Sequence, residues 1–282
     1  MLRNNDIAIL IIFFNKLAQT ISCIESFIPS EQNIYILNNA SDPSAWSDLQ
    51  KRYIKNERFF FYNSDINLGP AGGRNLLLQK CKEDWVFLVD NDIVINPEGN
   101  WKQLFDENVL NEQTAKIFCP SVFNVHENAY SNNYKFIETN GTVHLQDTNE
   151  KITNYFSCCA VIINKSIFNT YGNFDEELFA FEDYEFSIRA MLSDTGNLAV
   201  YRLDNVEVIH DHQIQKTKQD KKAVLERYNE TRIKKSMDRI LIKHGIALEH
   251  DWQWWTKKQI SDMNGKSFVG KIKDKVLTYL KN

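Results

Sequence analysis

Two aspartates, Asp90 and Asp92, directly follow the apolar run Trp85–Val89. A buried strand does not tolerate uncompensated carboxylates, because removing them from water is costly. Carboxylates two positions apart in a turn can converge on one hard cation, and Mg²⁺ and Mn²⁺ prefer oxygen ligands that they often share with phosphates. The spacing therefore suggests a metal–phosphate site, and the alternative is a turn in which the aspartates cap the next segment.

The glycine-rich segment Gly69–Arg74 could bind an anion. Glycines permit a close approach of the backbone, the start of a helix favours negative groups, and the planar fork of Arg74 suits phosphate. The segment is neither a Walker loop nor a dinucleotide fingerprint. An ordinary loop between a strand and a helix remains the alternative.

An acidic cluster lies in the stretch FAFEDYEFSIRA, residues 179–190. Carboxylates held among aromatic rings can have a raised pKa and act as bases. Glu185 lies four residues before Arg189, so we assign it to a structural ion pair and leave Asp183 for chemistry. Acidic residues that only stabilise a helix N-terminus are the alternative.

His210 ends the apolar segment VEVIH and could complete a metal site with the two aspartates. A single histidine is more often structural, and the nearby His212 is a competing candidate.

The first half of the chain alternates short apolar segments with segments of helical periodicity. This alternation predicts an α/β fold with a parallel sheet and helices on both faces, in which ligands bind at the carboxyl ends of the strands. The turns at Asn15, Asn38–Asp42, Gly69–Arg74 and Asp90–Asp92 should therefore line one edge. The predicted strands are Ile7–Phe14, Asn33–Leu37, Phe59–Asn63 and Trp85–Val89, and the predicted helices are Lys16–Ile28, Ser44–Asn56 and the segment from the glycine turn to Lys82.

The second half is less regular. Residues 124–154 are polar and suggest a hairpin or a loop, and residues 215–244 read as one long charged helix. The remaining predicted elements are strands at Ile117–Phe123, Cys158–Ile163, Leu198–Tyr201 and Val206–His210 and a helix at Phe179–Ala190.

The composition is that of a folded protein, with 282 residues, 43% of them hydrophobic, and a net charge of −4 that gives no indication of nucleic-acid binding. Residues 213–243 nevertheless carry a net charge of +6, and residues 266–282 carry +4. The five cysteines fit neither a zinc module nor a disulfide framework, which favours reduced thiols in the cytoplasm.

Taken in order, these segments resemble the inverting nucleotide-sugar glycosyltransferases of family two, which have the GT-A fold. ILIIFFNK resembles the opening strand of that family, ILNNASD its nucleotide turn, NLGPAGGRN its arginine segment and FLVDND its D-x-D strand. NFDEELFAFEDYEFSIRA resembles its acidic block, and VIHDH its later histidine. The resemblance covers residues 7–212.

The resemblance implies a role for each matching residue. Asp92, Asp90 and His210 would bind Mn²⁺ or Mg²⁺, Asp183 would be the general base of a single inverting displacement, and Glu182 and Tyr184 would bind the acceptor. The implied donor-binding residues are Phe14, Asn15, Asn38, Asp42, Asn67, Gly69, Gly73, Arg74, Asp90 and Asn91. Asn38 replaces the aspartate that often reads the base, and its amide can still accept from a pyrimidine N–H, which suggests a UDP-sugar donor.

The implied organisation is a GT-A catalytic domain over residues 1–212, with a nucleotide-binding half at 1–97 and an acceptor-binding half at 98–212, followed by a basic helical region at 213–282. Residues 266–282 have a basic amphipathic pattern, so residues 251–282 could contact an anionic membrane surface or pack on the domain. Membrane contact would make the protein peripheral on the inner face of the cell membrane. The implied acceptor is a glycan of bacterial surface polysaccharide synthesis, and membrane contact would favour a polyprenyl-linked glycan.

Two other functions fit parts of the sequence. A sugar-nucleotide nucleotidyltransferase also uses Mg²⁺ and a Rossmann-like sheet, but its glycine-rich signature should follow the first strand, where this chain has FFNK. A non-catalytic glycan-binding protein of the same fold would need neither metal nor nucleotide.

Overall fold

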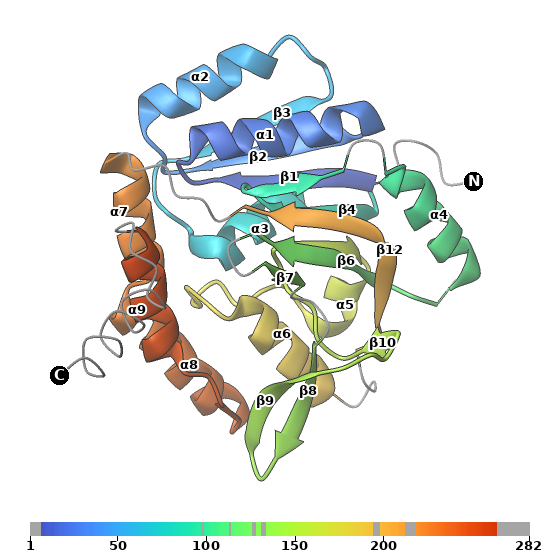
Figure 1. Ribbon diagram of the computed structural model, residues 1–282, viewed down its shortest axis with the longest axis vertical. Coiled ribbons are helices and arrows are strands. Elements are labelled where there is room, and N and C mark those ends of the chain that lie inside the picture. The colour runs from blue at the N-terminus through green and yellow to red at the C-terminus, as the bar shows by residue number, and fades with distance from the viewer. Residues whose placement is uncertain are drawn as a thin grey trace, which may run out of the picture.

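The structure is a computed structural model that describes residues 7–96, 99–112, 114–125, 128–130, 134–193, 198–211 and 218–263. A large mixed sheet forms its centre, with helices on both faces (Figure 1). The strands in spatial order are β10 (Ile152–Thr153), β12 (Val200–His210), β6 (Ile117–Asn124), β11 (Ala160–Asn164), β4 (Trp85–Asp90), β1 (Ile7–Phe13), β2 (Asn33–Asn39) and β3 (Phe59–Ser64), while β5 (Ile93–Ile95) pairs with β12 and β7 (Ala129–Tyr130) pairs with β6.

Strands β3, β2, β1 and β4 run parallel to one another. The chain proceeds from β1 to β2 and β3 on one side and then returns to place β4 on the other side of β1. This reversal opens a crevice at the carboxyl ends of β1 and β4, where open α/β sheets bind their ligands. The α/β sheet with helices on both faces confirms the predicted fold class, and its first half is parallel as expected. The second half is mixed, because β11 pairs antiparallel with β4 and β6.

Alternate residues of the buried strands supply the two faces of the core. Ile7, Ile9 and Ile11 of β1 pack on one face, and Ala8 and Leu10 pack on the other. The first face is covered by α1 (Leu17–Phe27), α2 (Pro43–Tyr53) and α4 (Trp101–Asn111), and the second by α3 (Gly69–Lys80), α5 (Ile167–Tyr171) and α6 (Glu182–Met191). A 3₁₀ turn, η1 (Ile28–Ser30), follows α1.

A smaller sheet consists of β13 (Ala247–Leu248), β9 (Thr142–Asp147) and β8 (Tyr134–Thr139). The antiparallel β8–β9 pair is the hairpin expected within residues 124–154. Apolar residues of this hairpin, α6 and α8 (Glu230–His244) form a third core cluster. Helices α7 (Lys218–Arg227), α8 and α9 (Trp252–Met263) run along one side of the molecule towards the hairpin (Figure 1). None of the helices within the described ranges is long and apolar enough to cross a bilayer.

Three predicted elements are wrong in detail. The single helix expected at 215–244 is divided into α7 and α8, because the Asn229 side chain accepts a hydrogen bond from the Arg232 N–H and starts a new helix. The two strands predicted between 198 and 210 form one strand, β12, whose pairing with β6 shifts in register between Leu203 and Glu207, in the gap between the predicted strands. Helix α6 begins at Glu182, after Phe181 in a left-handed conformation.

Candidate active site

The turns that follow β1, β2, β3 and β4 are joined by hydrogen bonds at one edge of the sheet. The Asn15 N–H donates to Ser41 Oγ at 3.0 Å, and Asn15 Oδ1 accepts from the Asp42 N–H at 3.0 Å. Asn91 Nδ2 donates to the Asn15 carbonyl oxygen at 3.2 Å. The predicted grouping of these turns is therefore confirmed.

Asp90, Asp92 and His210 form the metal-binding candidate. One possible ligand atom from each lies within 4.8 Å of the others. Antiparallel pairing of β5 with β12 places His210 opposite Ile93, directly after Asp92 in the chain, so His210 Nε2 lies 3.2 Å from Asp92 Oδ1. The two carboxylates match the oxygen ligands that Mn²⁺ and Mg²⁺ prefer, and an imidazole is a common ligand of divalent transition metals. Asp92 is buried at 1% exposure, so the residues fit a divalent cation.

Lys16 also reaches this cluster. It follows β1, and its Nζ lies 2.7 Å from Asp92 Oδ2. Both side chains are largely buried, so the buried carboxylate of Asp92 has a cationic partner within the protein.

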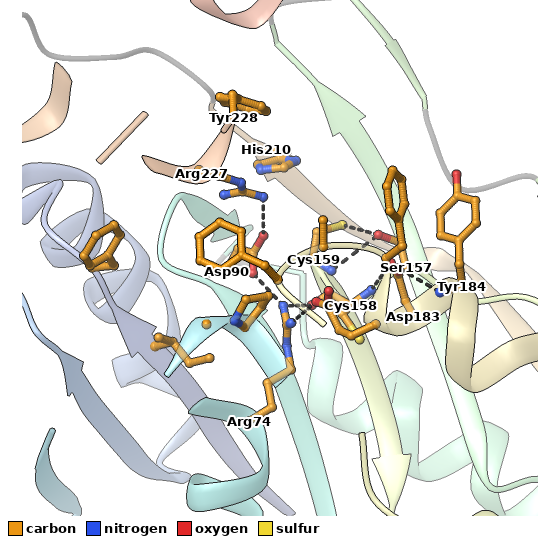
Figure 2. Close-up of a pocket in the computed structure, with 18 of the residues that line it drawn as sticks. Arg74, Asp90, Ser157, Cys158, Cys159, Asp183, Tyr184, His210, Arg227 and Tyr228 are labelled. Carbon is orange, nitrogen blue, oxygen red and sulfur yellow. Dashed lines mark hydrogen bonds and ion pairs between the residues drawn. The ribbon is translucent and has the colours of Figure 1, made fainter. Parts of the chain in front are cut away.

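Arg74 connects the metal candidate with the acidic helix α6 (Figure 2). Its guanidinium donates to Asp90 Oδ1 at 3.0 Å, to the Cys158 carbonyl oxygen at 3.2 Å and to Glu182. The planar guanidinium thus binds one carboxylate from β4 and one from α6, and it holds these two elements at a fixed separation.

Asp183 lies at the start of α6, where the Cys158 N–H donates to its Oδ2 at 3.2 Å and the Tyr184 N–H donates to its Oδ1 at 2.9 Å. Burial raises the pKa of the Asp183 carboxyl to about 7, the negative charge of Glu182 adds to the rise, and the hydrogen bond from Cys158 opposes it. A carboxyl with a pKa close to neutrality can accept a proton from a hydroxyl at physiological pH.

A cavity of about 440 Å³ joins these groups. Asp90, Arg74 and Asp183 line it together, and Figure 2 shows Asp90 and Asp183 on opposite sides of the Cys158–Cys159 backbone. The predicted residues that line the cavity are Phe14, Asn67, Gly69, Arg74, Asp90, Asn91, Glu182, Asp183, Tyr184 and His210. The predicted residues outside its lining are Asn15, Asn38, Asp42, Gly73 and Asp92.

Residues outside the lining support the site from behind. Asn15 and Asp42 hold the turns, and Asp42 also caps α2 by accepting from the N–H groups of Ser44 and Ala45. Gly73 packs α3 against the sheet, because an added Cβ would lie 2.8 Å from Ile12 Cδ1.

The side chain of Asn38 is engaged within the protein. Its Nδ2 donates to Asn63 Oδ1 at 2.6 Å, and its Oδ1 accepts from the Ser41 N–H at 3.0 Å. The next residue, Asn39, lines the cavity, donates to Asn67 Oδ1 at 3.0 Å and accepts from the Leu68 N–H at 2.8 Å. The sequence motif contained both asparagines, and the resemblance favoured the first.

Two groups of lining residues were not predicted from the sequence. Arg227 and Tyr228, at the end of α7, come from the segment assigned to a C-terminal region, and Arg227 Nη2 lies 3.8 Å from Asp90 Oδ2. The second group lies near Asp183 and comprises Tyr134, Leu145, Tyr155, Phe181 and His250. The local sequence around these residues did not indicate a binding site. The hairpin, α6 and His250 come together only through tertiary packing in and beside the third core cluster.

Glu185 is placed as the sequence predicted. Its carboxylate is fully buried, and Arg189 Nη2 donates to it at 3.0 Å. Lys243 Nζ and His244 Nε2 of α8 lie 2.9 Å and 2.8 Å from Glu185 Oε1. The residue therefore joins α6 to α8, and the structural assignment is confirmed.

The sequence profile of glycosyl transferase family 2 matches residues 8–172, more than half of the chain. The chain belongs to this family. A Haemophilus influenzae protein described as uncharacterized is 28% identical over 96 residues, which is 32% of this chain and 52% of that protein.

Solved structures of GT-A glycosyltransferases share the fold of this family 2 member. GalNAc-T7 with UDP, GalNAc and Mn²⁺ is 13% identical with a TM-score of 0.60, over 94% of this chain and 58% of that one. Residues 1–349 of S. aureus TarS in complex with UDP are 14% identical with a TM-score of 0.54, over 94% of this chain and 72% of that one. The chain thus covers little more than half of the GalNAc-T7 chain and of the H. influenzae protein.

Proposed function

We propose that this protein is a metal-dependent inverting glycosyltransferase that moves a sugar from a UDP-sugar to a hydroxyl of a glycan acceptor. The observation that carries the proposal is a carboxyl group with a pKa of about 7, Asp183, in the same cavity as the metal candidate residues Asp90 and His210. Family membership and the GT-A fold support it. The UDP in structures of GalNAc-T7 and TarS supports the choice of nucleotide.

Asp90, Asp92 and His210 would hold Mn²⁺ or Mg²⁺, which would bind the donor diphosphate and stabilise its negative charge as it leaves. Among the described residues that line the cavity are two arginines, Arg74 and Arg227, and both lie beside Asp90. Arg227 is the better placed to turn towards a phosphate, because its side chain is 53% exposed and its contact with Asp90 is long at 3.8 Å. Arg74 is instead held by three partners and would keep Asp90 and Glu182 in position.

The nucleoside would lie at the β1–β2 side of the cavity, lined by Phe14, Asn39 and Asn67. Asn39 and Asn67 bond to each other, so they present a fixed polar wall to the ribose or base. Asn15, Asn38 and Asp42 do not line the cavity, so they would stabilise the turns behind Asn39 and Asn67 without touching the nucleoside.

The acceptor would lie at the aromatic end beside Asp183. Tyr134, Tyr155, Tyr184 and Phe181 line this end, and an aromatic ring is a surface on which the apolar face of a sugar can pack. Burial lowers the pKa of His250, so its imidazole is neutral at pH 7 and can exchange a hydrogen bond with a hydroxyl. Asp183 would take the proton of the attacking hydroxyl, and one displacement would invert the anomeric carbon.

A polyprenyl-linked acceptor, a role in bacterial surface polysaccharide synthesis and a cytoplasmic location on the inner face of the membrane complete the proposal. Membrane contact would use residues 251–282. Among these residues the structure describes α9. Its Ile260 packs against Val224 and Tyr228 at the end of α7, and its Trp254 is 45% exposed. The amphipathic segment 266–282 lies outside the described residues.

A thermal-shift panel of UDP, dTDP, GDP and CMP, each with and without Mn²⁺, tests the donor site. We expect a shift with UDP that requires Mn²⁺ and is lost in Asp92→Ala. Release of UDP from a panel of UDP-sugars then identifies the sugar. Absence of any metal-dependent shift in the native protein would contradict the proposal and favour a non-catalytic glycan-binding protein, while a shift with another nucleotide would correct the donor class.

A further inference from the structure

The most informative contact outside the expected ligand set is the ion pair between Lys16 and Asp92. Lys16 Nζ lies 2.7 Å from Asp92 Oδ2, and the two side chains are only 12% and 1% exposed. An ammonium ion therefore compensates the more deeply buried of the two candidate metal-binding aspartates.

The backbone around Lys16 is held in place by hydrogen bonds, so the start of its side chain has a fixed position from which the ammonium group reaches Asp92. Asn15 and Lys16 have φ values of 57° and 54°, a left-handed conformation that is costly for residues other than glycine. The turn persists because Asn15 bonds to the Ser41–Asp42 turn and Asn91. Asn91 Nδ2 also donates to Thr20 Oγ1 at 2.9 Å, and Thr20 Oγ1 donates to the Lys16 carbonyl oxygen at 3.0 Å.

A divalent cation coordinated by Asp92 would lie close to this ammonium group. Like charges at such separations repel strongly when little water lies between them. The rigid turn leaves the four methylene groups of Lys16 as the part that can move. The side chain begins at the N-terminus of α1, an 11-residue helix without a side-chain cap, and helix N-termini favour anions.

We propose that Lys16 is an exchangeable cation that leaves Asp92 when the metal binds and then pairs with a phosphate oxygen of the donor. This inference rests on the proposed function. The divalent cation takes the place of the ammonium group on Asp92, and the diphosphate supplies the ammonium group with a new partner. Each ligand thus makes the binding of the other more favourable, and this coupling must be reciprocal.

Mn²⁺ binding to the purified full chain, followed by electron paramagnetic resonance of the free ion, tests the exchange. Titrations are made with Mn²⁺ alone and with UDP present, with allowance for Mn²⁺–UDP complexes in solution. For Lys16→Met we expect Mn²⁺ alone to bind about tenfold more tightly than to the native protein, since Asp92 has lost its competing cation. The strengthening by UDP should be about tenfold smaller than in the native protein.

Matched variants separate exchange from a structural role. Lys102→Met removes a lysine of similar exposure, 13%, whose Nζ lies 2.6 Å from Asp106 on α4, and it should bind Mn²⁺ as the native protein does. Lys16→Arg keeps the charge and should retain the coupling with UDP. If Lys16→Met does not fold, Lys16→Gln replaces it, because its amide can donate to Asp92 without a positive charge.

An unchanged Mn²⁺ affinity in the neutral Lys16 variants would overturn the exchange while leaving the metal site intact, provided that Asp92→Ala abolishes Mn²⁺ binding. A lower affinity would show that Lys16 only orders the site and would also overturn it. If the native protein binds no Mn²⁺ with or without UDP, both the exchange and the metal-dependent function fail.

Discussion

The proposed role of Asp183 as general base leads to a quantitative prediction for the pH dependence of sugar transfer. The carboxyl must be ionised to accept the proton of the attacking hydroxyl, and its pKa is about 7. Its ionised fraction is about one half at pH 7, about nine tenths at pH 8 and about one tenth at pH 6. The rate at saturating UDP-sugar and Mn²⁺ should therefore fall about tenfold between pH 8 and pH 6.

The cause of the raised pKa gives a second, directional test. Glu182 contributes negative charge that raises the pKa of Asp183, while the positive charge of Arg74 lowers it. Glu182→Gln removes the negative charge and leaves Arg74 with less compensation. The acid limb of the pH–rate profile should consequently move to lower pH, even if the maximum rate falls because Arg74 is less well held.

The assay is UDP release from the UDP-sugar identified by screening, measured from pH 5 to pH 9. Asp183→Asn should reduce the rate by about 10² to 10⁴-fold while UDP binding with Mn²⁺ is unchanged, and its residual rate should lack the acid limb. Asp238→Asn, which removes an exposed aspartate of α8, is the control. Full activity in Asp183→Asn, or an acid limb that survives in it, would refute the assignment of the base.

Three further predictions concern the scaffold. Glu185→Gln should lower the free energy of unfolding at pH 7 by about 2 kcal/mol, because the partly exposed Lys243 and Arg189 lose their buried partner. Burial opposes ionisation of Glu185, but the hydrogen bond from His244 and the charges of Arg189 and Lys243 lower its pKa. The stability difference between the native protein and Glu185→Gln should therefore be present above about pH 4.5 and vanish as the pH falls further. Urea titrations at several pH values measure it. Gly73→Ala should destabilise the protein by about 1 kcal/mol, since the clash of its Cβ with Ile12 outweighs the gain in helix propensity; thermal unfolding checks this, and a stabilised variant would contradict it. Asp42→Ala should cost about 1 kcal/mol through loss of the α2 cap, with Asp42→Asn close to native in the same measurement.

The first half of the fold was predictable because its signals are local. Strands β1 to β4 are short apolar segments separated by helices. Asp42 and Pro43 mark where α2 begins, and Pro70 marks the start of α3. The rule that ligands bind at the carboxyl ends of parallel strands then predicts Asn15, Gly69–Arg74 and Asp90 at one edge. Because both faces of the sheet are buried, each of these strands contains an unbroken run of apolar residues, which is easily recognised in a sequence.

The remaining features depend on contacts between distant segments. The division of α7 from α8 rests on the cap formed by Asn229, a weak signal inside a charged stretch. The continuity of β12 depends on pairing with β6 on one side and β5 on the other. Likewise, Asn38 and Asn39 are adjacent and chemically identical, and only the register of β2 against β3 decides which one reaches the cavity.

The C-terminal region is part of the candidate site rather than a separate attachment to it. The family profile ends at residue 172, yet Asp183, His210 and Arg227 all lie beyond it and line the cavity. Asn67 Nδ2 donates to Glu226 Oε1 at 3.1 Å, so the end of α7 is bonded to the turn that precedes α3. The proposed boundary at residue 212 therefore divides the chain at a point where the cavity is shared. Because α7 and α9 pack through Val224, Tyr228 and Ile260, a change in α9 can alter the position of Arg227 over Asp90. A membrane contact made by α9, as proposed above, would thus act on the proposed donor site through α7.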